Sequence, residues 1–162
     1  MIKRFNSRSV FIVLMALIVA AGVSSCSKDM LRPGGNLNAN QLVAGRLDGT
    51  WTTPRDIVTP QSVPPEVFGS MRLVFTTDDA GNPLKFMAHD CPIVFTNATA
   101  GNWSVTPTAD STKVSLTSVG PVDDFSIKMA SNSMTLSFFM GWENTDTKET
   151  GKGNFKVTLT RQ

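Results

Sequence analysis

Three adjacent residues, His89, Asp90 and Cys91, form the group in this sequence that most suggests chemistry. A cysteine near a histidine can supply a thiolate nucleophile when the imidazole takes the thiol proton. Neighbouring residues of a strand point to opposite faces, so only His89 and Cys91 would share a face, and no third group is placed to orient them. We therefore expect a bend at the end of a strand here, distorted by Pro92, and no enzyme activity.

Two pairs of aspartates raise the question of metal binding or acid–base chemistry. Asp78 and Asp79 lie in "DDAGNP", and Asp123 and Asp124 lie in "GPVDD". Both stretches have the composition of turns, in which an aspartate carboxylate bonds to its own backbone. The chain has no DxDxDG calcium loop, no CxxC pair and no Cys/His spacing suited to zinc. We therefore expect no metal site and no cofactor.

The N-terminal sequence predicts export. Residues 1–9 carry Lys3, Arg4 and Arg8 without an acidic residue, and residues 10–21 are twelve consecutive apolar residues. A charged segment before an apolar core is typical of a signal peptide. The apolar run is shorter than the roughly 20 residues that a transmembrane helix needs. The "VSSC" that follows resembles the bacterial lipobox, whose cysteine thiol receives a diacylglyceryl group.

The resemblance to a lipobox implies that Cys26 carries a lipid anchor in the membrane and begins the mature protein. Residues 1–25 are then the signal peptide, and residues 26–46 are the lipidated cysteine and a tether that contains Gly, Pro and Asn. Ser27 favours the outer membrane, and the periplasmic and cell-surface leaflets both stay open. With Cys26 acylated, Cys91 has no disulfide partner, and we expect its thiol to be buried.

Composition restricts the classes of partner. The chain from Cys26 to Gln162 has 137 residues, a length that suits one domain. Loss of the signal peptide leaves 12 of the 15 basic residues against 13 acidic ones. A mature chain that is close to neutral and has no basic cluster in its sequence is not expected to bind nucleic acid.

From residue 47 onward, apolar and polar residues alternate with a period of two, which predicts half-buried strands. Sequences rich in Gly, Asn, Asp and Ser separate the alternating segments and predict turns. One helical turn is expected in "NANQLVAG", just before the first strand. The predicted strands are residues 47–53, 69–77, 84–89, 92–97, 102–107, 112–118, 124–130, 133–142 and 153–161.

Short consecutive strands with one apolar face bury that face by closing on themselves. The two solutions are an up-and-down barrel and a β-sandwich. The short spacing between successive strands favours the barrel. We therefore expect an all-β domain over residues 47–162, a small antiparallel up-and-down β-barrel of 8–9 strands, with a β-sandwich as the alternative.

The first predicted strand contains "LDGTW", in which Gly49 and Trp51 resemble the Gly-x-Trp signature of lipocalins. A mid-chain W-x-V (Trp103, Val105) and a last strand ending at Arg161 extend the resemblance to the lipocalin-like lipoproteins of Bacteroidota. Arg161 falls in the apolar phase of its strand, and barrel closure would let its guanidinium stack on the Trp51 indole. The C-terminal helix of secreted lipocalins is missing, and the domain is shorter than theirs.

The residues expected to face the barrel interior are rich in methionine and phenylalanine. Flexible methionine side chains suit adaptable apolar pockets and also fill irregular cores. Phe139 is out of phase with its apolar neighbours and is expected to face outward, as a contact patch would. The candidate ligand-lining residues are Met71, Phe75, Phe125, Met129, Met134, Phe138, Met140 and Phe155.

Two functions remain open for an outer-membrane lipoprotein that binds rather than catalyses, of which the first is the leading prediction and the second is the alternative. One is the binding of a small apolar ligand inside the barrel or at its mouth. The other is an accessory or structural subunit that docks on an outer-membrane protein complex. A cavity lined by the Met and Phe residues would favour the ligand, and a filled interior with an exposed patch around Phe139 would favour docking.

One short motif points to a covalent modification. The "DST" at residues 110–112 resembles the O-glycosylation motif of Bacteroidota, with Ser111 as the candidate acceptor in a turn. So short a motif also arises by chance, and Ser111 stays a candidate only.

Overall fold

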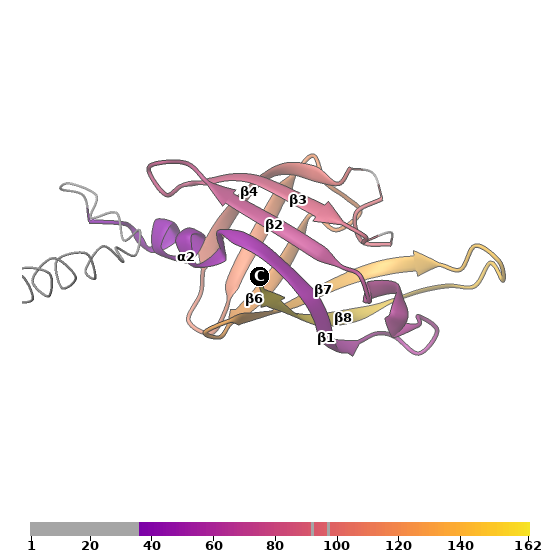
Figure 1. Ribbon diagram of the computed structural model, residues 1–162. Coiled ribbons are helices and arrows are strands. Elements are labelled where there is room, and N and C mark those ends of the chain that lie inside the picture. Colours follow the sequence, from indigo (N-terminus) through magenta and orange to yellow (C-terminus); the bar gives the residue numbers. More distant parts are fainter. Residues whose placement is uncertain (1–35, 92, 97) are drawn as a thin grey trace, which may run out of the picture. The chain divides into compact units, whose positions relative to one another are not determined.

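The computed structural model describes residues 36–91, 93–96 and 98–162 of the chain, so the predicted signal peptide, Cys26 and most of the predicted tether lie outside the described residues. The described strands form one closed antiparallel barrel in chain order (Figure 1). The all-β up-and-down barrel is thereby confirmed, and the β-sandwich is excluded. The strands are β1 (Gly49–Val58), β2 (Arg72–Thr77), β3 (Pro83–His89), β4 (Ala100–Pro107), β5 (Thr112–Thr117), β6 (Asp124–Met129), β7 (Ser133–Glu143) and β8 (Thr150–Arg161).

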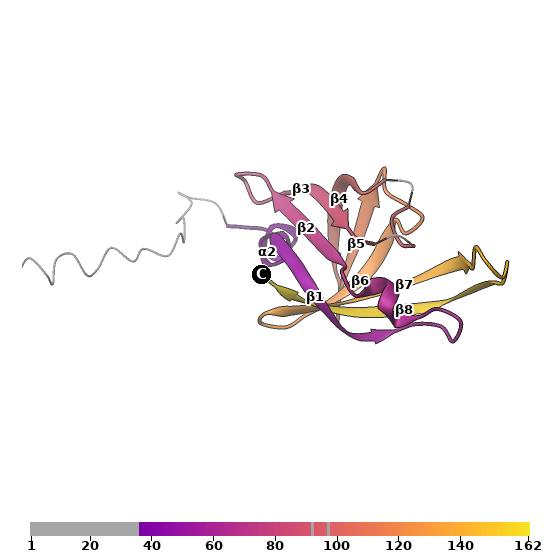
Figure 2. The ribbon, with the colours of Figure 1, turned by 45° about the vertical axis from the view of Figure 1, so that its right-hand side comes forward.

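The barrel closes because β1 pairs on one side with β2 and on the other with β8. Every other strand pairs with its neighbours in sequence, so the whole wall is built of hairpins. The strands surround a common interior in two views, and the β7–β8 hairpin reaches beyond the other strands in both (Figures 1 and 2). The pairing is not continuous along every strand: the printed register joins β1 to β2 only from Gly49 to Trp51, and β7 to β6 only from Met134 to Ser137.

The period-two alternation places apolar residues inside. In β6, Phe125 and Ile127 are buried while Ser126 and Lys128 are exposed. β7 buries four alternate residues in the same way, from Met134 to Met140. This alternation fixes which side chains are available on the outer surface.

β1 extends further than the sequence predicted, through Pro54 to Val58. Thr53 and Asp56 have positive φ values of 55° and 48°, and the pairing with β8 shifts register twice along this stretch. Such irregularities act as bulges, which bend a strand and admit residues that regular pairing would exclude. The proline therefore sits in a bent strand and does not end it.

The predicted strand at 92–97 is wrong for the residues that the structure describes there. Residues 93–96 form a turn, and the backbone N–H groups of Val94 and Phe95 both donate to the Cys91 carbonyl at 3.2 Å. Both side chains are buried. A short apolar run gives the same signal whether it pairs as a strand or packs as a turn against the end of a barrel.

A helix, α2 (Ala39–Leu47), precedes the barrel and extends the single turn expected there. It begins with a capping box, in which the Asn38 side chain accepts the Gln41 N–H and the Gln41 side chain accepts the Asn38 N–H, both at 2.9 Å. Ala44 and Leu47 are fully buried, and the helix contacts β2 and β4. The compact unit consequently begins at Leu37, before the domain boundary at residue 47 that the strand pattern suggested.

A short 3-10 helix, η1 (Pro65–Phe68), lies between β1 and β2. The sequence assigned residue 69 to the start of a strand, but β2 begins at Arg72. Phe68 is fully buried and contributes an aromatic ring to the core. The segment thus helps to fill the barrel without adding a strand.

Candidate functional site

The end of the barrel next to the start of β1 is closed by Arg161 and Trp51. Their Cα atoms pair across β8 and β1, and the guanidinium carbon lies 5.4 Å from the indole centroid. Trp51 Nε1 donates to the Leu47 carbonyl at 2.8 Å, and Arg161 Nη2 donates to the Asp48 carbonyl. Arg161, whose charge falls in the apolar phase of β8, is therefore stacked and hydrogen-bonded, as the sequence predicted.

Gly49 completes this cluster for two reasons. Its φ of +124° is one that residues with a side chain rarely adopt. A Cβ atom at this position would also lie 3.3 Å from Arg161 Nε. Gly49, Trp51 and Arg161 thus form a compact structural unit, in which Trp51 is buried and Arg161 is half-buried.

The candidate ligand-lining residues are packed against one another and against the rest of the core. Phe138 and Phe155 stack with an interplanar angle of 3° and centroids 5.4 Å apart. Phe68 meets both rings edge-on, at 6.4 and 5.9 Å. Seven of the eight candidates are buried and Met129 is half-buried: Met71, Phe75, Phe125, Met134, Phe138, Met140 and Phe155 make up the buried set.

A second aromatic cluster fills another part of the interior. Phe75 lies 5.1 Å from Phe86 and 5.0 Å from Trp103 between ring centroids. Phe86 also contacts the rings of Phe95 and Phe125, at 5.3 and 6.4 Å. Phe86 is absent from the residues predicted to line the interior, although its alternation with the exposed Lys85 and Met87 indicates an inward position. These rings fill part of the barrel interior with aromatic contacts.

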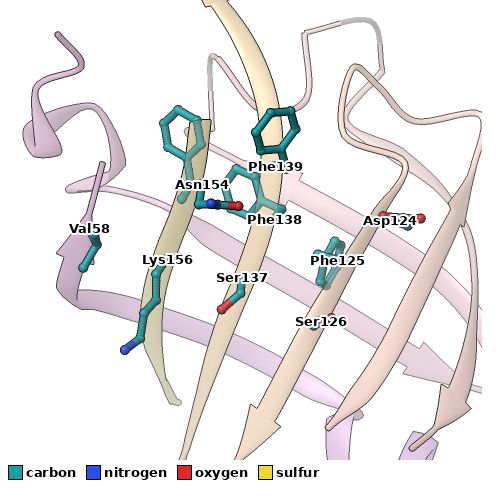
Figure 3. A pocket seen from close by; sticks show the side chains of 10 residues that line it. Val58, Asp124, Phe125, Ser126, Ser137, Phe138, Phe139, Asn154 and Lys156 are labelled. Atoms are coloured by element: carbon teal, nitrogen blue, oxygen red, sulfur yellow. The ribbon is translucent and has the colours of Figure 1, made fainter. Parts of the chain in front are cut away.

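A groove of about 480 Å³ lies on the outer face of the barrel, over β6, β7 and β8 and reaching β1 (Figure 3). Ser126, Ser137, Lys156 and Val58 stand opposite one another in successive strands and form a row across the sheet. The two serines are small and leave the row hollow at its centre. Phe139 borders this row at the next outward position of β7, two residues beyond Ser137 (Figure 3).

The lining is mixed: it contains exposed apolar side chains, the charged Asp124 and Lys156, and three buried residues that the sequence put forward as ligand-lining, namely Phe125, Phe138 and Phe155. Phe139 is 60% exposed, and Val58 is 54% exposed. The outward orientation predicted for Phe139 is therefore confirmed. Asn154 stands opposite Phe139 on β8 and adds an amide to the groove.

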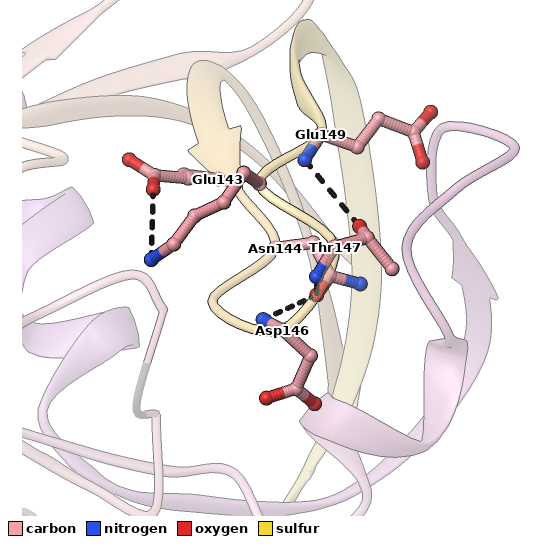
Figure 4. Close-up of polar contacts among 6 residues, drawn as sticks. Glu143, Asn144, Asp146, Thr147 and Glu149 are labelled. Carbon is pink, nitrogen blue, oxygen red and sulfur yellow. Dashed lines mark hydrogen bonds and ion pairs between the residues drawn. The ribbon is translucent and has the colours of Figure 1, made fainter.

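A smaller hollow of about 300 Å³ adjoins the tip of the β7–β8 hairpin, between Trp142 and the segment around Val63. The tip is a tight polar turn (Figure 4), in which Asn144 Oδ1 accepts the backbone N–H groups of Asp146 and Thr147 at 2.9 and 3.0 Å. Trp142 Nε1 is buried without a hydrogen-bond partner among the described residues. The two hydrogen bonds to Asn144 Oδ1 stabilise the turn itself.

Cys91 borders a third hollow, of about 460 Å³, with Glu66, Asp90 and Phe95. The thiol donates to the carbonyl oxygen of His89 at 3.1 Å and makes no bond to its imidazole. Burial, reinforced by the charge of Asp90, raises the pKa of Cys91 to about 12. The thiol is buried, as expected, and a neutral thiol near neutral pH is a poor nucleophile.

The acidic pairs take structural positions. Asp78 accepts the backbone N–H and the side-chain amide of Asn82, at 2.8 and 2.9 Å, and these bonds hold the pKa of Asp78 below its usual value. Asp124 pairs with Lys113 at 2.6 Å across β6 and β5. Among the residues that the structure describes, no group of three His, Cys, Asp or Glu side chains is placed to hold a metal ion.

Ser111, the candidate glycosylation acceptor, lies in the turn between β4 and β5. It is half-buried, and its hydroxyl is 3.1 Å from the Thr108 hydroxyl. The Thr108 hydroxyl also donates to the Ser111 carbonyl at 2.7 Å. Attachment of a sugar would therefore require this local pair to open.

No family model, no curated protein and no solved structure matches the chain. Within residues 36–91, 93–96 and 98–162, no helix has the length and apolar character required to cross a membrane. The function has to follow from the chain's own sequence and geometry.

Proposed function

We propose that this chain is a lipid-anchored accessory protein of the outer membrane, which docks on a membrane protein complex through the groove beside Phe139. Cys26 would carry the anchor, and the barrel would act as a rigid binding module without enzyme activity. The observation that carries the proposal is the contrast between the two faces of β7. Phe138 is stacked inside the barrel, while Phe139 is 60% exposed on the rim of a groove.

The exposed ring supplies a driving force for association. Full burial of a phenylalanine side chain contributes about 1.5–3 kcal/mol relative to leaving it in water. Phe139 and Val58 border one groove from two different strands, so a single partner surface could cover both. Apolar anchors surrounded by polar groups are typical of interaction surfaces.

The alternative function, an apolar ligand inside the barrel, has less support from the geometry. A ligand between Phe138 and Phe155 would have to separate two stacked rings that are both buried. Aromatic pairs of this kind contribute about 0.5–1.5 kcal/mol beyond the area that they bury. The described hollows that border Phe139, Trp142 and Cys91 are also not lined mainly by the Met and Phe residues that the sequence put forward.

The anchor and the lipocalin-like ancestry are proposals that rest on the sequence. "VSSC" supplies the acylation motif, and the Trp51–Arg161 stack is what the resemblance to lipocalins implied. A lipid anchor would hold the barrel at a membrane surface, where a side-chain docking site encounters membrane proteins at high local concentration.

Photo-cross-linking in native membranes tests the docking proposal. A photoreactive phenylalanine analogue replaces Phe139 in the full precursor, and the matched control carries it in place of Leu84, which is 46% exposed on β3. We expect discrete protein adducts at position 139 and none of the same mass at position 84. Equal adducts at both positions, or none at 139, would contradict docking through this face.

A further inference from the structure

Positive charge gathers on the outer face around the groove, although the mature chain as a whole is close to neutral. Lys128 on β6 and Lys152 and Lys156 on β8 are exposed at outward-facing positions. Lys156 lines the groove, and Lys128 lies two residues from Ser126 on the same face. None of the three lysines forms an ion pair with another described residue.

Asp124, which lines the groove, and Asp56, which lies two residues from Val58 on β1, have cationic partners. Asp124 lies 2.6 Å from Lys113, and Asp56 lies 4.0 Å from Arg55. Each of these pairs is neutral as a unit. Asp123, next to Asp124, is exposed and forms no ion pair with another described residue, so the three unpaired lysines outnumber the unpaired carboxylate and leave a net positive charge around the groove.

The floor of the groove offers unused hydrogen-bonding groups. The side chains of Ser126, Ser137 and Asn154 make no hydrogen bond to another residue in the described part of the chain. Hydroxyl and amide groups both donate and accept, so they suit the backbone and polar side chains of a peptide segment. Exposed apolar side chains, unpaired hydroxyl and amide groups, and lysines therefore lie together on one surface.

We propose that this groove binds an acidic segment of a partner protein that also carries an apolar side chain. The carboxylates of the segment pair with Lys156 and Lys128, and its apolar side chain packs against Phe139 and Val58. This inference rests on the proposed docking function and adds the chemistry of the partner. Complementary charge of this kind speeds association and selects among partners.

Other occupants fit the groove less well. A second copy of this chain placed symmetrically on the same patch would bring two lysine-bearing surfaces face to face, and the repulsion between like charges opposes association. An anionic bilayer would attract the lysines, but a broad surface cannot fill a hollow of about 480 Å³ floored by Ser126 and Ser137. A protein segment meets both the charge and the shape.

Charge reversal combined with cross-linking at position 139 tests this chemistry in native membranes. One variant carries Lys128→Glu and Lys156→Glu, and its control carries Lys85→Glu and Lys148→Glu, which make the same change in net charge on β3 and at the hairpin tip. We expect the adduct yield to fall at least about tenfold in the first variant and to stay unchanged in the control. Lys128→Arg with Lys156→Arg should keep the yield, since the charge is kept.

Mass spectrometry of the adduct identifies the segment, which we expect to carry a net negative charge. The inference alone is overturned by an adduct to a neutral or basic segment, to a lipid or to a second copy of the chain, or by equal losses in the two charge-reversal variants. Absence of any adduct at position 139 overturns the proposed docking function as well, so the two failures are distinguishable.

Discussion

At the scale of single residues, Arg161 at the packed end of the barrel and Phe139 at the outer groove both depart from the alternation of inward apolar and outward polar residues. Arg161 lies in an apolar phase but is stacked on Trp51 and bonded to the Asp48 carbonyl. Phe139 lies in a polar phase and has no such partner. The first departure from alternation stabilises the fold, and the second leaves an aromatic ring exposed to solvent.

Removal of the stacked cation should destabilise the fold. Arg161→Ala is expected to lower the free energy of unfolding by about 1–2 kcal/mol, the contribution of a partly desolvated cation–π contact. Arg161→Lys should restore only part of the loss, because an ammonium cannot stack as a planar guanidinium does. Denaturant unfolding measures both, and an Arg161→Ala midpoint equal to that of the wild type would contradict the role of the stack.

The buried thiol predicts a specific alkaline response. Folding raises the pKa of Cys91 to about 12, whereas an unfolded cysteine titrates near about 8.5. The thiol's contribution to stability is therefore fully present below about pH 8.5 and is lost as the pH rises toward about 12. Cys91→Ala should lack this part of the alkaline decline in unfolding midpoints.

A thiol reagent should label Cys91 slowly in the folded protein and quickly in the unfolded protein. Equal labelling rates would show that the thiol is exposed.

At the scale of elements, the β7–β8 hairpin carries residues of both the outer groove and the packed interior. Its strands pair from Ser133 with Thr160 to Glu143 with Thr150, so Phe139 and Lys156 are held on one continuous ladder. Near its tip, the Trp142 indole covers Gly151, where a Cβ atom would meet Trp142 Cζ2 at 2.5 Å. The packing of this hairpin therefore depends on a glycine at position 151, opposite Trp142.

The glycines of this hairpin give a matched pair of substitutions. Gly151→Ala should displace the Trp142 indole and lower the unfolding midpoint, because the added methyl group overlaps the ring. Gly141→Ala should be tolerated, since the nearest atom to its new Cβ is the Gly151 carbonyl oxygen at 3.6 Å. Unfolding midpoints and tryptophan fluorescence check both variants. Similar losses in the two would contradict the packing of Trp142 over Gly151.

Sequence alternation predicted the strands well where each strand buries one face. β5, β6 and β7 lie within a residue or two of their predicted bounds, because their inward residues are apolar and their outward residues polar. The pattern failed at 92–97, since Val94 and Phe95 are buried in a turn, and it ended β1 too early, since bulges at Thr53 and Asp56 carry that strand past Pro54.

The candidate site was only partly predictable. The outward orientation of Phe139 follows from its phase within one strand. The groove beside it depends on which residues of β6, β8 and β1 stand opposite Ser137, and a single sequence does not determine that register. The gathering of Lys128 and Lys156 around the groove was hidden for the same reason, because 27 residues separate them in the chain.

At the scale of the whole molecule, closure of the barrel places one set of side chains inside and leaves the alternate set on the outer surface. The interior rings pack against one another, and every described strand has two neighbours in the wall. An anchor at Cys26 would keep this rigid surface close to the membrane, which suits an accessory subunit better than a free carrier of ligands.

Hydroxyl-radical footprinting of the full-length protein tests the central claim most directly. Oxidation of Phe139 is compared between native membranes and the purified protein, with the exposed Leu84 on β3 as the internal reference. The account predicts that membranes protect Phe139 several-fold and leave Leu84 unchanged, because a partner covers the groove. Equal oxidation of Phe139 in membranes and in the purified protein would contradict docking through this face.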